Sequence, residues 1–367
     1  SLFTTGQKCS VSQRNNSFIR GGLELITERL NVSDIERDKI NIDRAAEILK
    51  NGGIVAIPTE TVYGLAADAY NIDAVKRIFE AKGRPQDNPL IVHVSDMKML
   101  SEVTGNVPAK ALECAEAFWP GPFTMVLPRG ERIPAAVSAG LDTVAVRMPS
   151  NSVAHEIIKR SGLPLAAPSA NLSGSPSPTT AEHVLLDLDG RIDAVVVSGR
   201  ADVGVESTVV TLCTDPPRLL RPGGITLEQL KKVLPDIVVD KAVLSAPEEG
   251  KPVASPGMKY KHYSPKAKVV ILDGDLDSFV NYVESRKCEG EFALCFEGKE
   301  KRLTIPTVSF GKMDSDESQA AVLFDALREL DKKGCRLCYA RMPRKSGVGL
   351  AVYNRLIRAA AFEVIKL

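Results

Sequence analysis

The stretch from Ile54 to Val94 contains a strand, a helix and a second strand in immediate succession, and this order constrains the fold most strongly. Ile54 to Ile57 is a short β-branched run, which is typical of a buried strand. Apolar residues at helical spacing run from Ile72 to Phe79, and Gly83 stands where a left-handed helix cap is expected. Leu90 to Val94 predicts the next strand. This alternation indicates an α/β fold.

The chain from Val269 onward alternates in the same way, which predicts a second, smaller α/β domain with a parallel sheet. Gly347 and Gly349 lie between a predicted strand and a predicted helix, but the final glycine of the dinucleotide fingerprint is absent, so the motif is weak. Strands are expected at Val269–Leu272, Phe292–Phe296, Thr307–Phe310 and Leu337–Arg341, and helices near Ser278–Arg286, near Ser318–Lys332 and from about Leu350.

Length and charge limit the class of protein. The 367 residues leave room for two or three domains, and a formal net charge of +1 excludes a globally basic nucleic-acid binder, although a local basic patch stays open. No apolar run approaches the roughly 18 residues of a membrane span, and the polar start has no signal-peptide block, so we expect a cytoplasmic protein.

The cysteines and histidines give little evidence of a disulfide framework or a metal site. Seven cysteines at irregular spacing argue against a disulfide framework. Cys335 and Cys338 form a C-x-x-C within the apolar run CRLCYARM, and on a strand positions i and i+3 face opposite ways, which disfavours a redox or metal role. The sequence contains no P-loop, no H-E-x-x-H, no G-x-S-x-G and no usable metal-ligand cluster among its four histidines.

Polar residues surround the first strand–helix–strand unit. Residues 59–61 leave the end of the first strand, and Lys82 and Arg84 straddle the end of the helix. His93 faces away from its two neighbours on the second strand. Two cations beside hydroxyls and a histidine suit a polyanion with a polar reacting end. A solvated helix end and a satisfied core histidine remain the alternative.

Two later strands also end in polar residues. Thr143 and Arg147 stand at the ends of an alternating strand within Gly140–Ser150, and Arg147 is either a ligand clamp or a surface ion-pair partner. The strand Leu163–Ala167 runs into a loop, starting at Pro168, that contains four serines and an asparagine. Ligands of open α/β sheets bind at such carboxyl ends. A plain Ser/Pro loop is the alternative.

The middle of the chain adds further candidates. Thr179 and Glu182 predict a helix capping box, Ser207 precedes another strand, and Arg221 is expected at the rim of the first domain. In the segment Ser255–Lys268, lysines interleave with tyrosines and a histidine, so this segment can cover an anion and stack on a base. A solvated basic linker is the alternative.

The segments PTETVYGL, KGRPQDNPLIVH, WPGPFT, GLDTVAVRMP, APSAN, GVEST and LLRPG follow one another in this order. Together they resemble the YrdC-like family. With SPGMKYKHYSP and the α/β tail, the chain from about residue 38 onward resembles the two-domain threonylcarbamoyl-AMP synthases, and only the first 35 or so residues are unmatched.

The resemblance implies a YrdC-like twisted mixed sheet with helices around a concave basic cavity, plus a smaller Rossmann-like α/β domain. We expect an N-terminal extension over residues 1–35, a catalytic domain over 36–225, a linker or lid over 226–266, and a C-terminal domain over 267–367.

The resemblance also implies the reaction. A nucleotidyltransferase of this family makes L-threonylcarbamoyladenylate and pyrophosphate from L-threonine, bicarbonate or CO2, and ATP with Mg2+. The product serves the N6-threonylcarbamoyladenosine modification of tRNA, and a downstream threonylcarbamoyl transferase complex is the expected partner. A weak contact with tRNA stays open, and no membrane partner is expected.

The family's motifs imply roles for individual residues of this sequence. The catalytic residues implied are Lys82, Arg84, Ser169 and Asn171. The residues implied for L-threonine are Thr61, His93, Arg147, the backbone at Ala167, and Ser207. The residues implied for ATP are Arg84, Asn88, Thr143, Ser169, Ser177, Arg221 and Tyr263. No side chain is assigned to a metal.

Two other functions compete. In the first, a basic concave face and the Lys/Tyr linker bind structured RNA, and no adenylation takes place. Salt-dependent RNA affinity without threonine-dependent ATP cleavage would favour this function. Carbamoyl adenylation from carbamoyl phosphate, as in hydrogenase-maturation proteins, lacks support because the acylphosphatase and zinc-finger segments found there are missing. Threonylcarbamoyl-AMP synthesis ranks ahead of both.

Overall fold

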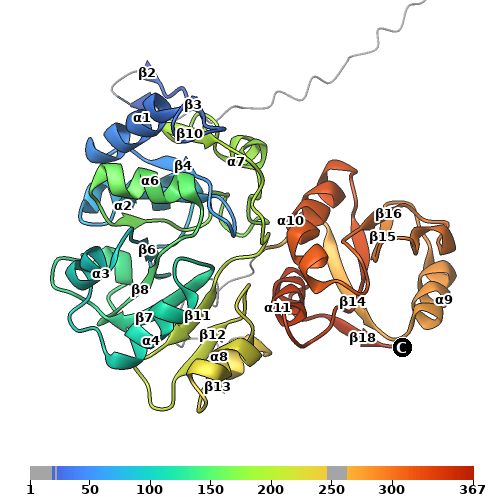
Figure 1. Ribbon diagram of the computed structural model, residues 1–367. Coiled ribbons are helices and arrows are strands. Elements are labelled where there is room, and N and C mark those ends of the chain that lie inside the picture. Colours follow the sequence, from blue (N-terminus) through green and yellow to red (C-terminus); the bar gives the residue numbers. More distant parts are fainter. Residues whose placement is uncertain (1–18, 21–22, 246–262) are drawn as a thin grey trace, which may run out of the picture.

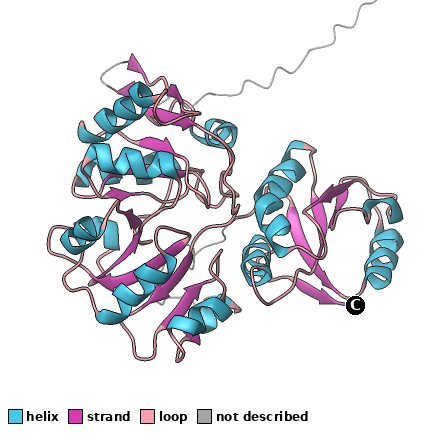
Figure 2. Ribbon diagram, in the orientation of Figure 1, coloured by secondary structure: helices cyan, strands magenta, loops and turns pink. Residues whose placement is uncertain are grey.

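The computed structural model of the protein describes residues 19–20, 23–245 and 263–367. Figure 1 shows two domains side by side, the larger running from blue to yellow and the smaller in orange and red. The larger domain is built on an 11-stranded mixed sheet and the smaller on a five-stranded sheet. Figure 2 shows strands flanked by helices in both domains, which confirms the predicted α/β class. No helix in the described part of the chain is long and apolar enough to cross a membrane.

The large sheet has the strand order β13-β12-β11-β7-β8-β6-β9-β5-β4-β10-β3. Parallel and antiparallel pairs occur together, as the resemblance implies: β6 is parallel to β8, and β7 is antiparallel to it. The strands are β3 (Glu28–Asn31), β4 (Val55–Ile57), β5 (Gly64–Asp68), β6 (Ile91–His93), β7 (Phe123–Pro128), β8 (Thr143–Arg147), β9 (Leu165–Ala166), β10 (Ala194–Val197), β11 (Thr208–Thr211), β12 (Arg218–Arg221) and β13 (Val238–Val239). A separate hairpin joins β1 (Ile19–Arg20) and β2 (Leu23–Glu24).

The helices of this domain begin and end where local chemistry favours it. The Asn71 side chain accepts hydrogen bonds from the first turn of α2, and Gly83 ends that helix at φ 61°, as predicted. Asn151 and Gly162 cap α6 in the same way. The helices are α1 (Lys39–Lys50), α2 (Ile72–Lys82), α3 (Met97–Val103), α4 (Ala109–Phe118), α5 (Ala135–Ser138), α6 (Ser152–Ser161), α7 (Ala181–Leu188) and α8 (Leu227–Val233), with a 3-10 turn η1 at Lys241–Val243.

The predicted capping box at the start of α7 is wrong by one residue. Thr180, not Thr179, is the N-cap, and its hydroxyl accepts from the His183 backbone N–H at 3.4 Å. Thr179 instead donates its hydroxyl to Asp325 of the smaller domain at 2.7 Å. Adjacent threonines make the two registers hard to separate by sequence, and the contact with Asp325 comes only with the tertiary fold.

Regular structure extends past the expected limits of the catalytic domain on both sides. β3 lies in the predicted N-terminal extension and pairs in parallel with β10. α8, β13 and η1 lie in the predicted linker, and β13 pairs in parallel with β12. The rest of that linker, from 246 to 262, lies outside the described residues, so the predicted lid is described only from Tyr263 onward.

The smaller sheet has the order β16-β15-β17-β14-β18, and every pair in it is parallel, as predicted. Its last strand, β18, has no counterpart among the predicted strands. The strands are β14 (Lys268–Asp273), β15 (Glu291–Cys295), β16 (Thr307–Ser309), β17 (Leu337–Arg341) and β18 (Val364–Lys366). The helices are α9 (Leu276–Arg286), α10 (Asp316–Lys332) and α11 (Gly349–Ala359), with a 3-10 turn η2 at Glu300–Arg302.

Two motifs of this domain are explained by packing. Cys335 precedes β17 and does not lie on it, so the prediction that the two cysteine side chains face opposite ways is wrong. The Cys335 and Cys338 thiols are hydrogen-bonded to each other, and this bond lowers the pKa of Cys335. A Cβ at Gly349 would approach the Arg344 carbonyl oxygen and the Asp316 carboxylate within about 3 Å. Close packing of the loop on α10 therefore accounts for Gly349.

The two domains share a packed interface. Figure 1 shows α10 and α11 on the side of the smaller domain that faces the larger one, and α9 on the opposite side. Val62 and Val205 of the larger domain belong to the hydrophobic cluster formed mainly by the smaller domain, and Tyr263 joins them. The wall that carries Val62 and Val205 therefore depends on both domains for its packing.

Candidate active site

A cavity of about 60 Å³ lies at the carboxyl ends of β6 and β8 and at the start of β11. The loops after β4 and β9 complete its walls. Nine residues singled out from the sequence line it: Thr61, Arg84, His93, Arg147, Ala167, Ser169, Ser207, Arg221 and Tyr263. Strand register explains much of this set. His93 on β6 pairs with Arg147 on β8, and Arg147 pairs with Thr124 on β7, so one row crosses the sheet beneath the cavity.

Arg147 is buried and forms an ion pair inside the protein, so it is not a surface residue. Its side chain forms an ion pair with Glu60 at 2.7 Å, and its Nη1 donates to the Thr61 hydroxyl at 2.8 Å. Burial opposes ionisation of Glu60, but Arg147 outweighs burial and the pKa of Glu60 is lowered. Sequence analysis placed Glu60 at a strand end without a role. The structure shows that Glu60 holds the guanidinium in place.

Arg221 forms a second cationic group on the neighbouring wall. It is 6% exposed, so it is buried instead of lying at the domain rim. Its Nε donates to the Ser207 carbonyl oxygen at 3.0 Å and its Nη2 to the Ser207 hydroxyl at 3.1 Å. The Ser207 hydroxyl also lies 2.8 Å from that of Thr124. These bonds fix the position of both side chains.

Arg84 supplies a third guanidinium. Its Nη2 donates to the backbone carbonyl oxygens of Asn88 at 3.3 Å and Pro89 at 3.1 Å, which turns the side chain back over the loop after α2. Its Nε is buried and has no hydrogen-bond partner among the described residues. Burial lowers the pKa of Arg84 to about 10, so the group stays charged at neutral pH.

His93 is neutral. Burial, with the nearby Arg147 adding to it, lowers the pKa of the imidazole to about 3. Its Nδ1 is buried and finds no partner in the described part of the chain. The core-histidine alternative therefore fails on geometry, because the ring lines the cavity with an unsatisfied nitrogen.

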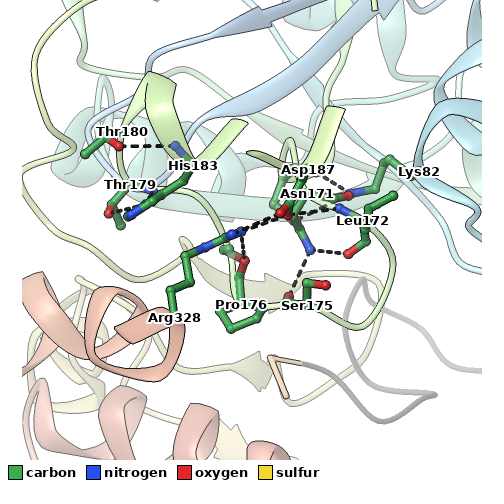
Figure 3. Close-up of polar contacts among 12 residues, drawn as sticks. Lys82, Asn171, Leu172, Ser175, Pro176, Thr179, Thr180, His183, Asp187 and Arg328 are labelled. Atoms are coloured by element: carbon green, nitrogen blue, oxygen red, sulfur yellow. Dashed lines mark hydrogen bonds and ion pairs between the residues drawn. The ribbon is translucent and has the colours of Figure 1, made fainter. Parts of the chain in front are cut away.

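Lys82 and Asn171 do not line the cavity, but they contact each other beside it; Figure 3 shows the two side chains together. The Lys82 ammonium donates to the Ser169 carbonyl oxygen, to the Asn171 carbonyl oxygen at 2.6 Å and to Asn171 Oδ1 at 3.5 Å. The Asn171 amide in turn donates to the carbonyl oxygens of Leu172 at 2.7 Å and Ser175 at 2.9 Å. Burial, with Arg84 adding to it, lowers the pKa of Lys82 well below its ordinary value. Lys82 thus organises the loop that presents Ser169.

Three further residues that the resemblance implies for ATP binding, Asn88, Ser177 and Thr143, do not line the cavity. Asn88 is buried beside Arg84, and the Ser177 hydroxyl donates to the cavity residue Glu206. Thr143 lies at the amino end of β8, whereas Arg147 reaches the cavity from the carboxyl end of the same strand. Four residue steps along a strand span about 13 Å, so Thr143 is separated from the arginine cluster.

Glu206 and Arg355 were missed by sequence analysis. Arg355 of α11 is fully buried, and its Nε donates to the Glu206 carboxylate at 2.7 Å across the domain interface. Burial opposes ionisation of Glu206, but Arg355 and Arg221 outweigh it and the pKa of Glu206 is lowered. The Arg355 guanidinium also lies 5.5 Å from the centre of the Tyr263 ring. The signal was an Asn-Arg pair inside the otherwise apolar stretch LAVYNRLI.

The charges of the site favour a polyanion. Three guanidiniums face the cavity, while the two lining or adjacent carboxylates, Glu60 and Glu206, are each paired with an arginine. Among the described residues no group of three His, Cys, Asp or Glu side chains is placed to hold a metal ion. The cavity therefore combines excess positive charge, a neutral imidazole and the hydroxyls of Thr59, Thr61, Ser169 and Ser207. Such a set can bind phosphate and carboxylate groups.

Comparison with known proteins places this two-domain α/β chain in a defined class. A family model described as "Telomere recombination" (Sua5, YciO and YrdC) matches residues 47–223, and one described as "Threonylcarbamoyl-AMP synthase, C-terminal domain" matches residues 225–361. The chain is 46% identical to a Bacillus subtilis protein named threonylcarbamoyl-AMP synthase, over 93% of this chain and 97% of the relative. A Pyrococcus abyssi protein of the same name is 44% identical, over 91% and 97%.

A solved structure agrees with these relatives. The structure of P. abyssi Sua5 complexed with L-threonine matches with a TM-score of 0.84 and 40% identity, over 93% of this chain and 99% of that chain. The chain belongs to the Sua5 family of two-domain threonylcarbamoyl-AMP synthases. The resemblance drawn from the ordered motifs is confirmed.

Proposed function

We propose that the protein synthesises L-threonylcarbamoyladenylate and pyrophosphate from L-threonine, bicarbonate or CO2, and ATP, for the N6-threonylcarbamoyladenosine modification of tRNA. The observation that carries this proposal is the convergence of Arg84, Arg147 and Arg221 on one cavity in a chain of this family. Such a cavity suits a substrate pair with one carboxylate and several phosphates.

L-threonine is assigned to the part of the cavity around Arg147. A free amino acid needs a cation for its carboxylate and polar partners for its hydroxyl and amine. Arg147 keeps a fixed guanidinium beside Thr61, and the neutral His93 offers an unsatisfied ring nitrogen. The structure of P. abyssi Sua5 complexed with L-threonine supports this choice of amino acid. The backbone at Ala167 and the Ser207 hydroxyl complete the proposed threonine set.

ATP is assigned to the part around Arg84 and Arg221. Both guanidiniums are held by backbone carbonyl oxygens, so their remaining donors are oriented before any ligand binds. Mg2+ would enter as a component of the substrate MgATP, where it neutralises phosphate charge. The carboxylates of Glu60 and Glu206 are already paired with arginines, so side-chain ligation of that ion is not expected.

The proposed chemistry needs no covalent enzyme intermediate. The threonine amine adds to CO2 and loses one proton, which gives a carbamate. A carbamate oxygen then bonds to the α-phosphorus of ATP as the bond to the pyrophosphate oxygen breaks. Charge develops on phosphate oxygens, where Arg84 and Arg221 stabilise it electrostatically. With a pKa of about 3, His93 acts as a hydrogen-bonding partner and is a poor base for the amine.

The substrates need more room than the present cavity gives. Sites for ligands of this size have volumes of roughly 300–1,000 Å³, whereas the cavity measures about 60 Å³. Binding therefore requires its walls to separate. Tyr263 lines the cavity and belongs to the hydrophobic cluster that the two domains share.

The proposal is tested by pyrophosphate release from MgATP with bicarbonate and one of several amino acids. We expect release with L-threonine, and much less with L-serine, which lacks the methyl group, or L-valine, which lacks the hydroxyl. Arg84→Ala should lower turnover on the order of 10²-fold or more, as for removal of one transition-state donor. Undiminished turnover of a folded Arg84→Ala variant would contradict the assignment.

A further inference from the structure

A second cavity, of about 780 Å³, lies in the smaller domain and shares no lining residue with the first. Its walls come from three loops that follow β15, β16 and β17, together with the first turns of α10. Lining residues of chemical interest are Phe296, Lys299, Lys312, Gln319, Arg341 and Arg344. None of them takes part in the reaction proposed above.

The position of this cavity follows from the topology of the sheet. β15 and β17 are neighbours and parallel, with Leu294 opposite Ala340 near their carboxyl ends. The chain leaves β15 toward β16 on one side, and it leaves β17 through α11 toward β18 on the other. Adjacent strands whose connections run in opposite directions form a topological switch point, which is where open parallel sheets bind ligands. The cavity stands at this switch point.

Two buried side chains on its walls have unsatisfied polar atoms. Arg341, at the end of β17, is 7% exposed, and its Nη1 donates to the Gly274 carbonyl oxygen at 3.2 Å. Its Nε has no hydrogen-bond partner among the described residues. Gln319 of α10 is 1% exposed; its amide nitrogen donates to the Lys312 carbonyl oxygen at 2.7 Å, whereas its Oε1 finds no partner there. Such groups are costly unless a ligand or water satisfies them.

The remaining lining side chains favour an anion with an apolar part. Lys299 and Lys312 have no ion-pair partner within the described chain, whereas Arg344 is paired with Asp316 at 2.9 Å. Four cationic side chains line the cavity against two carboxylates, Glu297 and Asp314. Phe296 and two methionines supply apolar surface beside them.

We propose that this cavity binds a phosphorylated small molecule of mononucleotide size. The phosphate bonds to Arg341 with Lys299 and Lys312, and an N–H or O–H of the ligand donates to Gln319 Oε1. The apolar lining contacts a flat ring of the ligand. The inference stands apart from the proposed reaction, because it uses neither the first cavity nor its residues.

The test uses AMP and inorganic phosphate as probes on the full chain. Calorimetric titration gives the affinity, and amide hydrogen exchange with and without AMP locates the site. We expect AMP to protect the backbone of residues 296–299 and 312–319. Phosphate alone should compete with AMP for that protection if the phosphate group provides the recognition. Protection by AMP without competition by phosphate would overturn the assigned phosphate contacts.

Two variants separate this site from the first cavity. Arg341→Gln should weaken AMP binding in the smaller domain at least about tenfold, as for a lost hydrogen bond to a charged group. Lys312→Ala, at the exposed rim, should weaken AMP binding without leaving a buried group unpaired. Lys301→Ala in η2 is the matched control, because Lys301 is exposed and does not line the cavity. Arg341→Gln and Lys312→Ala should both keep the threonine-dependent turnover of the wild type. Unchanged protection of 296–299 in Lys312→Ala and Arg341→Gln, or no protection in the wild type, would overturn the proposal.

Discussion

The Arg355 guanidinium of the smaller domain lies 2.7 Å from the Glu206 carboxylate of the larger domain, and neither group has appreciable contact with solvent. Glu206 immediately precedes Ser207, and its other carboxylate oxygen accepts from Ser177. Arg355 also donates to the carbonyl oxygens of Pro222 at 2.9 Å and Glu206 at 3.2 Å. One side chain of the C-terminal domain therefore holds both loops that carry Ser207 and Arg221.

The Arg355→Met variant tests the strength of this link. It should lose about 3–5 kcal/mol of unfolding free energy, because removal of one partner leaves a buried carboxylate without compensation. Urea unfolding measures the change. Replacing both partners, as Arg355→Met with Glu206→Leu, should recover part of the loss. Arg302→Met is the matched control, since its ion pair with Asp277 is exposed and such pairs contribute at most about 1 kcal/mol.

The same link predicts a kinetic effect. Because Arg355 positions Ser207 and Arg221 and does not line the first cavity, Arg355→Lys should raise the KM for ATP more than it lowers kcat. Steady-state kinetics at saturating L-threonine separates the two constants. Wild-type constants in the folded variant would show that the interface stabilises the protein without positioning the site.

Lys82→Ala should lower turnover on the order of 10²-fold in a protein that still folds, because a displacement of about 1 Å in an active-site group can cost that much. The physical reason is loss of the ammonium that ties the carbonyl oxygens of Ser169 and Asn171 together. The control is Lys76→Ala on the same helix, whose ammonium forms only an exposed ion pair with Asp73 at 3.5 Å. Equal turnover in the two variants would show that Lys82 does not position the Ser169 loop for the reaction.

Arg147→Lys should raise the KM for L-threonine about 10- to 100-fold, because lysine cannot reproduce a planar guanidinium held by Glu60 and Thr61. The KM for ATP should change much less, since Arg84 and Arg221 are assigned to the phosphates. Substrate-dependence curves for each substrate test this. A larger effect on ATP than on threonine would reverse the assignment of the two parts of the cavity.

His93 makes stability depend on pH. Its folded pKa of about 3 lies below the ordinary value of 6.5, so the unfolded chain binds one more proton between these values. Stability due to this group is therefore present above about pH 6.5 and falls as pH decreases toward 3. His93→Asn should lower the slope of unfolding free energy against pH near pH 5 by about 1.4 kcal/mol per unit. An unchanged slope would show that His93 is protonated in the folded protein.

Much of the local structure could be predicted because it depends on neighbours in sequence. Gly83 after an amphipathic run indicates a helix end, and the alternation within Gly140–Ser150 indicates β8 with Arg147 at its end. Nine of the residues that the ordered motifs single out line one cavity, and their roles stay predictions.

The missed features depend on contacts between distant parts of the chain. Glu206 and Arg355 are separated by 149 positions, and no period in either segment relates them. Likewise, Thr179 contacts Asp325 across the two domains. Asp187 and Arg328 form an ion pair, which Figure 3 shows, and their charged atoms lie 2.8 Å apart. A charged residue inside an apolar helix indicates a buried partner, but only the fold identifies that partner.

The decisive measurement is mass spectrometry of the adenylate formed from MgATP, L-threonine and ¹³C-bicarbonate. The proposed reaction predicts a threonylcarbamoyl-AMP that is one mass unit heavier than the product from ordinary bicarbonate, and no such product without L-threonine. Absence of a labelled adenylate from folded, ATP-binding protein would contradict carbamate formation from bicarbonate and, with it, the assignment of the arginine-lined cavity.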